Sequence, residues 1–116
     1  MPAIPEITVE DLAAKLRSEE PFVLLDVREN WELESARIAD PRLVVTPMSE
    51  LAQLGLRALP QQAQPHEAEI LVLCHHGNRS GQVAAWLSAR GWTRAFSVAG
   101  GIDEYARKID KSVGSY

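Results

Sequence analysis

The segment from residue 74 to residue 80 concentrates side chains that can do chemistry. It holds a thiol, two imidazoles, a glycine, an amide, a guanidinium and a hydroxyl, in the order Cys74, His75, His76, Gly77, Asn78, Arg79, Ser80. Backbone N–H groups of a tight loop and of a following helical turn can form an anion-binding concavity. An ionised sulfur gains hydrogen bonds there, so we expect the segment to favour Cys74 as the nucleophilic thiolate.

The other side chains of this segment have more than one possible use. Arg79 either contacts an anionic substrate or holds the loop by bonding carbonyls or a carboxylate. A protonated His75 or His76 would add positive charge, although both can equally be polar loop residues, and no third ligand lies nearby in sequence to predict a metal site. Gly77 allows the backbone to close around one large atom. We expect Ser80 to be the N-cap of the following helix and allow that it also faces the sulfur.

Cys74 is the only cysteine of the chain, so an intramolecular disulfide and a metal cage of several cysteines are excluded. The lone thiol is either a small buried apolar residue or the reagent of the site. The polar loop that follows it favours the reagent.

Strands and helices alternate along the chain and must position this loop. Apolar runs predict strands over residues 22–27, 43–45, 70–73 and 95–98, and helical periodicity appears over 9–16, 29–35, 48–54, 83–87 and 102–109. Short connections between them indicate an α/β domain with a mainly parallel central sheet and helices on both faces. Sites of such folds lie beyond the carboxyl ends of the strands, where Cys74 follows residues 70–73.

Length and charge exclude several classes of protein. The chain has 116 residues, of which 46% are hydrophobic, enough for one core and a single domain over residues 1–116. A net charge of −4 gives no reason to bind nucleic acid or an anionic membrane. No apolar run reaches the roughly 18 residues of a membrane span. Since the N-terminus has neither a basic stretch nor an apolar signal core, we expect a cytoplasmic protein.

Several polar and aromatic residues outside the loop are assigned structural roles. Asp26 and Arg28 stand at the end of a strand near the expected site, where we expect them to pair with neighbouring groups or to cap the backbone rather than to catalyse. Glu32 and Glu34 are interpreted as a solvated helix face. The tryptophans are too scattered to stack on bases and are assigned to packing: Trp31, Trp86 and Trp92.

The chain resembles a single-domain rhodanese of the rhodanese-like sulfurtransferase family over roughly residues 5–110. Five segments in the family's order carry the resemblance: Leu25-Asp26-Val27-Arg28-Glu29, Arg37-Ile38, Pro47-Met48-Ser49-Glu50-Leu51, Leu73-Cys74-His75-His76-Gly77-Asn78-Arg79-Ser80 and Val98-Ala99-Gly100-Gly101-Ile102. The sequence departs from the family pattern at Ala36-Arg37 and Asp40-Pro41, outside the loop. His75 and His76, where some members have arginine or lysine, leave the donor preference open.

The resemblance implies a sulfur-transfer reaction at Cys74. This cysteine would accept a sulfane sulfur from a donor such as thiosulfate, form a persulfide cradled by residues 75–80, and pass the sulfur to cyanide, a thiol or a protein acceptor in ping-pong fashion. The partners are then a small-molecule donor and acceptor, or a protein acceptor, with no metal or organic cofactor. The oligomeric state stays open.

Two other functions compete with sulfurtransferase turnover. One is a persulfide carrier or sensing module that hands sulfur to a protein partner, and the other is a phosphatase-like enzyme. Four residues separate Cys74 from Arg79. The resemblance implies a six-residue loop that closes around sulfur, whereas the related phosphatases carry one residue more, so the spacing disfavours phosphate chemistry.

Overall fold

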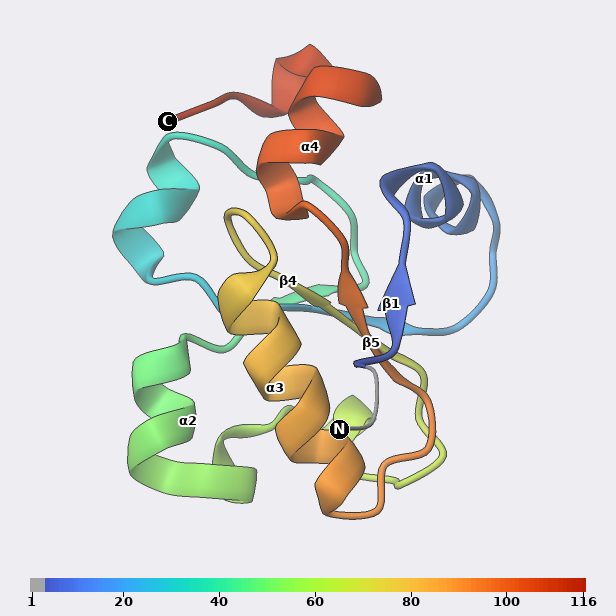
Figure 1. Cartoon of the computed structure of the whole chain (residues 1–116), viewed down its shortest axis with the longest axis vertical. Coiled ribbons are helices and arrows are strands. Elements are labelled where there is room, and N and C mark those ends of the chain that lie inside the picture. Colours follow the sequence, from blue (N-terminus) through green and yellow to red (C-terminus); the bar gives the residue numbers. More distant parts are fainter. Residues whose placement is uncertain (1–3) are drawn as a thin grey trace.

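Five parallel strands form one sheet in the order β1-β5-β4-β2-β3 in the computed structural model, which describes residues 4–116 (Figure 1). The strands are β1 (Glu6–Ile7), β2 (Val23–Asp26), β3 (Leu43–Val45), β4 (Ile70–Leu73) and β5 (Ala95–Val98). All four strand pairings are parallel. The α/β class is therefore confirmed, with a sheet that is wholly rather than mainly parallel.

Within residues 4–116, four α-helices cover the two faces of the sheet. They are α1 (Val9–Arg17), α2 (Met48–Leu54), α3 (Asn78–Ala89) and α4 (Gly101–Lys108). One apolar cluster joins the sheet to α1 and α4, and a second joins it to α2 and α3, so that helices lie on both faces as predicted. Among the described residues, no helix combines the length and the apolar character that crossing a membrane requires.

The position of β2 and β4 in the centre of the sheet explains why their sequences are continuously apolar. Leu25 of β2 and Val72 of β4 face the α2 and α3 side, whereas Leu24 and Leu71 face the α1 and α4 side, and all four are inaccessible to solvent. Successive side chains of a strand point to opposite faces, so a strand covered on both sides needs apolar residues throughout. The same register carries Cys74, directly after β4, into the α2 and α3 cluster.

Shorter elements complete the chain. The described part of the chain also has four 3-10 helices: η1 (Asn30–Glu34), η2 (Gly55–Ala58), η3 (Gln61–Ala63) and η4 (Lys111–Val113). The helix predicted over residues 29–35 is thus a single 3-10 element. It begins with a capping box in which the Glu29 and Glu32 side chains accept each other's backbone N–H groups. β1 was not predicted because two residues carry no readable alternation.

The three tryptophans differ in their surroundings. Trp92 is buried and donates its ring N–H to the Ala63 carbonyl at 2.8 Å, and Trp86 packs partly buried against the core. Trp31 is 65% exposed, so its assignment to packing was wrong. It lies on the solvent-facing side of η1, and its ring is edge-on to the ring of Tyr116, with 6.5 Å between the ring centroids.

Candidate active site

β4 delivers Cys74 to the carboxyl end of the sheet, and the chain then turns at once into α3. Cys74 is only 1% exposed, so its sulfur lies at the floor of the loop rather than on the surface. Gly77 is the N-cap of α3 and has a φ of 105°, a conformation that L side chains rarely adopt. A Cβ at this position would lie 3.2 Å from the backbone nitrogen of Gly100. Glycine is therefore needed where the loop closes, and the nearest atom to an added Cβ belongs to the Gly100 backbone.

Among residues 4–116, two groups are hydrogen-bonded to the sulfur. The Gly77 N–H donates to Cys74 Sγ at 3.0 Å, and the thiol donates to Ser80 Oγ at 3.3 Å. Ser80 Oγ also lies 2.8 Å from Ser97 Oγ and donates to the Gly77 carbonyl at 3.2 Å. Ser80 is buried in the first turn of α3, so its prediction as N-cap was wrong because Gly77 occupies that position. Its hydroxyl does face the sulfur.

The start of α4 holds the first residues of the loop through their carbonyls. The Ile102 N–H donates to the Cys74 carbonyl at 2.9 Å, and the Asp103 N–H donates to the His75 carbonyl at 3.1 Å. These are free N–H groups of a first helical turn, which have no partner within their own helix. The carbonyls of Cys74 and His75 are thereby tied to α4.

Gly101 makes this close approach possible, and its replacement tests it. Its φ is 64°, and a Cβ there would lie 2.4 Å from the His75 carbonyl oxygen and 2.5 Å from that of Cys74. Gly55 has a similar φ of 62° with nothing within 4 Å of an added Cβ. We expect Gly55→Ala to cost about 1–3 kcal/mol of backbone strain. Gly101→Ala should cost about 1–3 kcal/mol more, because of the overlap with the loop.

Urea unfolding of the two glycine variants measures this difference. Sulfur loading of Cys74 should slow in Gly101→Ala and stay unchanged in Gly55→Ala. Equal losses of stability in both variants would contradict the close approach of α4 to the loop.

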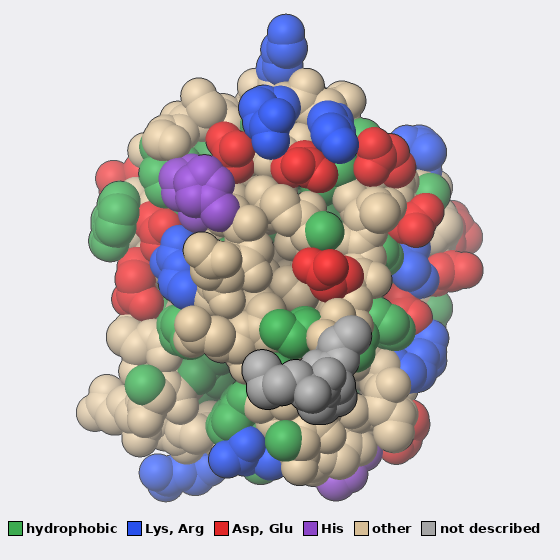
Figure 2. Space-filling view, viewed as in Figure 1, with side chains coloured by type: hydrophobic (Ala, Val, Ile, Leu, Met, Phe, Trp, Pro, Cys, Tyr) green, Lys and Arg blue, Asp and Glu red, His purple; other side chains and the backbone are tan. Residues whose placement is uncertain are grey.

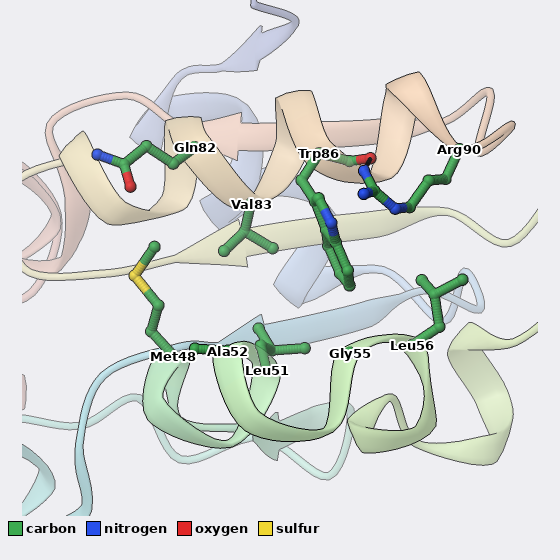
Figure 3. A pocket seen from close by; sticks show the side chains of 9 residues that line it. All are labelled: Met48, Leu51, Ala52, Gly55, Leu56, Gln82, Val83, Trp86 and Arg90. Atoms are coloured by element: carbon green, nitrogen blue, oxygen red, sulfur yellow. Dashed lines mark hydrogen bonds between the residues drawn. The ribbon is translucent and has the colours of Figure 1, made fainter.

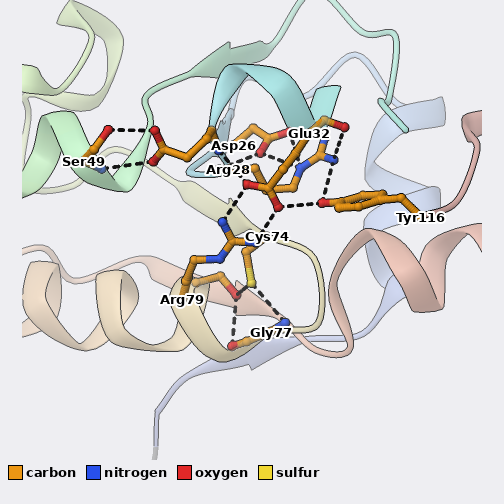
Figure 4. A network of polar contacts seen from close by, with 10 residues as sticks. Asp26, Arg28, Glu32, Ser49, Cys74, Gly77, Arg79 and Tyr116 are labelled. Carbon is orange, nitrogen blue, oxygen red and sulfur yellow. Dashed lines mark hydrogen bonds and ion pairs between the residues drawn. The ribbon is translucent and has the colours of Figure 1, made fainter. Parts of the chain in front are cut away.

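Arg79 is bound to Glu32, a carboxylate predicted to face solvent. Its guanidinium donates to both oxygens of Glu32, at 2.7 and 2.8 Å (Figure 4). The Glu32 side chain is 4% exposed and also accepts from the Glu29 N–H and the Tyr116 hydroxyl, each at 2.8 Å. Glu32 as part of a solvated face was therefore wrong, whereas Glu34 is exposed as predicted. The contact favours the second use of Arg79, in which it holds the loop through a carboxylate.

The pKa of Glu32 gives this contact a pH signature. The Arg79 guanidinium, together with the Glu29 N–H and the Tyr116 hydroxyl, lowers the pKa of Glu32 to about 2 against the opposing effect of burial. The unfolded chain binds a proton near pH 4.5 and the folded chain near pH 2, so the stabilisation is complete above pH 4.5 and is lost as the pH falls towards 2. Its size is roughly 3 kcal/mol. Glu32→Gln should therefore flatten the dependence of stability on pH over this window, measured by urea unfolding, and an unchanged slope would contradict the pairing.

Asp26 and Arg28 pair with each other beneath this contact. Both side chains are inaccessible to solvent, and the guanidinium donates to both carboxylate oxygens, with the shortest distance 2.8 Å. Arg28 Nη1 lies 3.2 Å from the Tyr116 hydroxyl, which in turn bonds Glu32. Figure 4 shows how this chain of contacts runs from the end of β2 to the loop. The arrangement fits the structural role predicted for the pair, and it includes Tyr116, which no sequence pattern indicated.

The two histidines stack at the mouth of the loop. Their ring centroids are 3.8 Å apart, and the His75 ring also stacks on Tyr116 at 3.9 Å. Burial, with a smaller contribution from the charge of His76, lowers the pKa of His75, so this imidazole is neutral at pH 7. His76 is exposed, with Nδ1 at 3.8 Å from Asp103. Asn78 begins α3 with an exposed side chain.

Asp103 supplies a third possible metal ligand beside the two histidines, and the sequence did not indicate it because Asp103 lies on α4, far along the chain. One donor atom each from His75, His76 and Asp103 lies within 4.8 Å of the others, so these residues could hold a metal ion. The two rings are stacked at 29° to each other, and Asp103 already pairs with Arg107. An ion shared by the three residues would therefore compete with Arg107 for the Asp103 carboxylate.

A groove of about 560 Å³ lies apart from the loop, between α2 and α3 (Figure 3). Its lining is mostly apolar: Met48, Leu51, Ala52, Gly55, Leu56, Gln82, Val83, Trp86 and Arg90. The Arg90 guanidinium lies over the Trp86 ring, 4.8 Å from its centroid. No residue of the 74–80 loop lines this groove, so the chemistry of the site is separate from it.

Comparisons with known proteins match this architecture. The family model described as a rhodanese-like domain covers residues 8–108. The rhodanese-like/PpiC domain-containing protein 12 of Arabidopsis thaliana is 36% identical over 97% of this chain, which spans 38% of that protein. A sulfurtransferase of Allochromatium vinosum is 28% identical over 90% of each chain. The structure of the human single-domain sulfurtransferase TSTD1 aligns with a TM-score of 0.72 and 28% identity, over 91% of this chain and 98% of that one.

Proposed function

This chain belongs to the rhodanese-like domain family, and from that membership we propose that it is a sulfurtransferase that carries sulfur on Cys74 as a persulfide. The observation that supports this most directly is the environment of Sγ. The sulfur lies at the carboxyl end of β4 and receives the Gly77 N–H, with the Ser80 hydroxyl beside it. Such donors stabilise an anionic sulfur, whether thiolate or persulfide.

The proposed reaction consists of two displacements at sulfur. The Cys74 thiolate attacks the sulfane sulfur of the donor, the donor's bond to that sulfur breaks, and the rest of the donor leaves with the electron pair. With thiosulfate the leaving group is sulfite. A nucleophilic acceptor then attacks the outer sulfur of the persulfide, and Cys74 leaves as thiolate. One cysteine thus serves both half-reactions without net oxidation, which predicts ping-pong kinetics.

Ser80 has a specific part in this cycle. With a neutral thiol its oxygen accepts the S–H, and its own proton goes to the Gly77 carbonyl. Once Cys74 is ionised, rotation of the hydroxyl brings that proton to the sulfur instead. Ser97, 2.8 Å away, supplies a second hydroxyl that keeps the Ser80 oxygen hydrogen-bonded in either state.

Sulfur uptake followed by transfer tests the proposal. The purified protein is incubated with thiosulfate or a thiol persulfide, separated from the donor, and weighed intact before and after cyanide is added. We expect the mass of one sulfur atom on the protein and thiocyanate formation when cyanide removes it. Sulfur that is taken up but not turned over would identify a carrier that needs a protein acceptor. Release of phosphate from an aryl phosphate without sulfur uptake would instead identify the phosphatase-like alternative.

The partners follow from the same proposal. They are a small-molecule sulfur donor and a small-molecule or protein acceptor, within a single domain that acts in the cytoplasm without a bound cofactor. The spacing of four residues between Cys74 and Arg79 supports a sulfur-sized rather than a phosphate-sized loop.

A further inference from the structure

We infer that the sulfur donor is a thiol persulfide, or another compound with no more than one negative charge on the group that contains the sulfane sulfur. Thiosulfate, a dianion, should be a poor donor. This inference rests on the proposed function. The positive charges around the loop are already paired with carboxylates. They therefore give little attraction for a second negative charge beside an ionised Cys74.

Arg79 is the loop's own cation, and Glu32 already neutralises it. Both of its contacts go to the two oxygens of one carboxylate, and that carboxylate is nearly buried. The Glu29 N–H and the Tyr116 hydroxyl hold Glu32 from other directions, so it cannot swing away while these contacts persist. Arg79 therefore presents an ion pair to the loop rather than a free positive charge.

Arg28, the next cation along this network, is neutralised in the same way. It is fully buried and bidentate with Asp26. A substrate could recruit Arg28 only by breaking a buried ion pair, which leaves an uncompensated charge in the core. Neither guanidinium on this side of the loop is free to bind an anion.

The imidazoles do not replace these cations. His75 lies between the rings of Tyr116 and His76 and is neutral at pH 7. His76 faces the Asp103 carboxylate, which Arg107 also approaches at 3.3 Å. Figure 2 shows acidic and basic side chains interspersed around exposed histidine on one face of the molecule. The surface around His75 and His76 therefore carries charges of both signs.

One further carboxylate makes the region more negative. Glu29 accepts the Ser49 hydroxyl at 2.8 Å and the Ser49 N–H at 3.2 Å, at the start of α2. Within residues 4–116, no lysine, arginine or histidine forms an ion pair with Glu29. The ion pairs near Glu29 have no net charge, so its carboxylate adds one uncompensated negative charge to the region.

The two donor classes differ in how much negative charge the reaction gathers. With thiosulfate, a thiolate meets a dianion, and the products are an anionic persulfide and a sulfite dianion. With a protonated thiol persulfide, the Cys74 thiolate attacks the outer sulfur, the donor's S–S bond breaks, and the thiolate that leaves carries the only charge. Like charges repel more strongly when they are partly buried, so an unpaired cation matters far more for thiosulfate.

Two donors that undergo the same reaction but differ in charge test this inference. Methanethiosulfonate is a monoanion, thiosulfate is a dianion, and both give up a sulfane sulfur bonded to an oxidised sulfur atom. The rate of sulfur loading on Cys74 is measured by intact mass for each, divided by its rate with free cysteine. We expect this normalised rate to be at least tenfold higher for the thiosulfonate. Loading by thiosulfate should accelerate as salt screens the repulsion.

Glu32→Gln tests the cause of this preference. The variant keeps an oxygen acceptor for Arg79 but removes the negative charge, so thiosulfate loading should rise about tenfold and should now slow with added salt. Glu34→Gln, at an exposed acid on the same 3-10 helix, is the matched control and should change neither rate. Thermal unfolding establishes that Glu32→Gln is folded under the assay conditions.

The outcomes are distinguishable from failure of the proposed function. Equal normalised rates for the two donors in the wild type, with thiosulfate loading that slows as salt rises, would overturn the inference while leaving sulfur transfer intact. The wild-type comparison decides this even if Glu32→Gln does not fold. Failure of every donor to load sulfur on Cys74 would overturn the proposed function itself.

Discussion

Cys74→Ser is expected to abolish sulfur transfer, lowering turnover by at least about 10⁴-fold. A serine hydroxyl is a far weaker nucleophile than a thiolate at neutral pH, and its oxygen cannot form the persulfide on which both half-reactions depend. The replacement is nearly isosteric, and the Gly77 N–H and the Ser80 hydroxyl can still bond an oxygen, so the loop should keep its shape. Thiocyanate formation and the intact mass of the protein after exposure to donor measure the two half-reactions.

Ser80→Ala is the control that separates the reagent from its surroundings. It removes the hydroxyl beside the sulfur but leaves the thiol and the Gly77 N–H. We expect this variant still to take up one sulfur atom, at a rate about tenfold lower because one hydrogen bond to the anionic sulfur is lost. Uptake of sulfur by Cys74→Ser would contradict the assignment of Cys74 as the carrier atom.

Arg28→Met is expected to lower the free energy of unfolding by about 3–5 kcal/mol. The methionine fills much of the same volume, but it leaves the Asp26 carboxylate buried without its partner. The substitution also removes the donor that reaches the Glu32 carbonyl and the Tyr116 hydroxyl. Urea unfolding at neutral pH measures the loss.

Two further variants identify the buried charge as the cause. Arg107→Met makes the same change at an exposed arginine whose contacts with Asp103 and Glu104 lie at the surface, and it should cost less than about 1 kcal/mol. Adding Asp26→Asn to Arg28→Met removes the unpaired charge and should restore part of the lost stability. A cost below 1 kcal/mol for Arg28→Met alone would contradict this account.

The sheet and the loop were predictable because their sequence patterns are local. The apolar runs that became β2 and β4 need burial on both faces, and the polar residues after β4 stand directly before the periodic pattern of α3. Strand end, loop and helix are consecutive in the chain, so composition alone indicates a site there. The two glycines between β5 and α4 are equally local, but the close approach of Gly101 to the loop carbonyls is visible only in three dimensions.

The charge environment of the site was not predictable in the same way. Glu32 pairs with Arg79 across 47 positions of sequence, and Tyr116 reaches Glu32 across 84. On a short element with exposed neighbours, a single glutamate gives the same sequence pattern whether it faces solvent or a distant guanidinium. The contact that most changes the expected substrate is therefore one that only the fold brings together.

The hydrogen bonds from Ile102 and Asp103 to the loop carbonyls also have a dynamic consequence. Amide protons in such bonds exchange with solvent only when the structure that holds them opens. We expect slow exchange at these two amides, at a rate shared with the core of the sheet rather than with surface loops. An acceptor that approaches the persulfide would then meet a loop whose shape is already fixed. The loop would not have to become ordered at each turnover, so binding would not cost that conformational entropy.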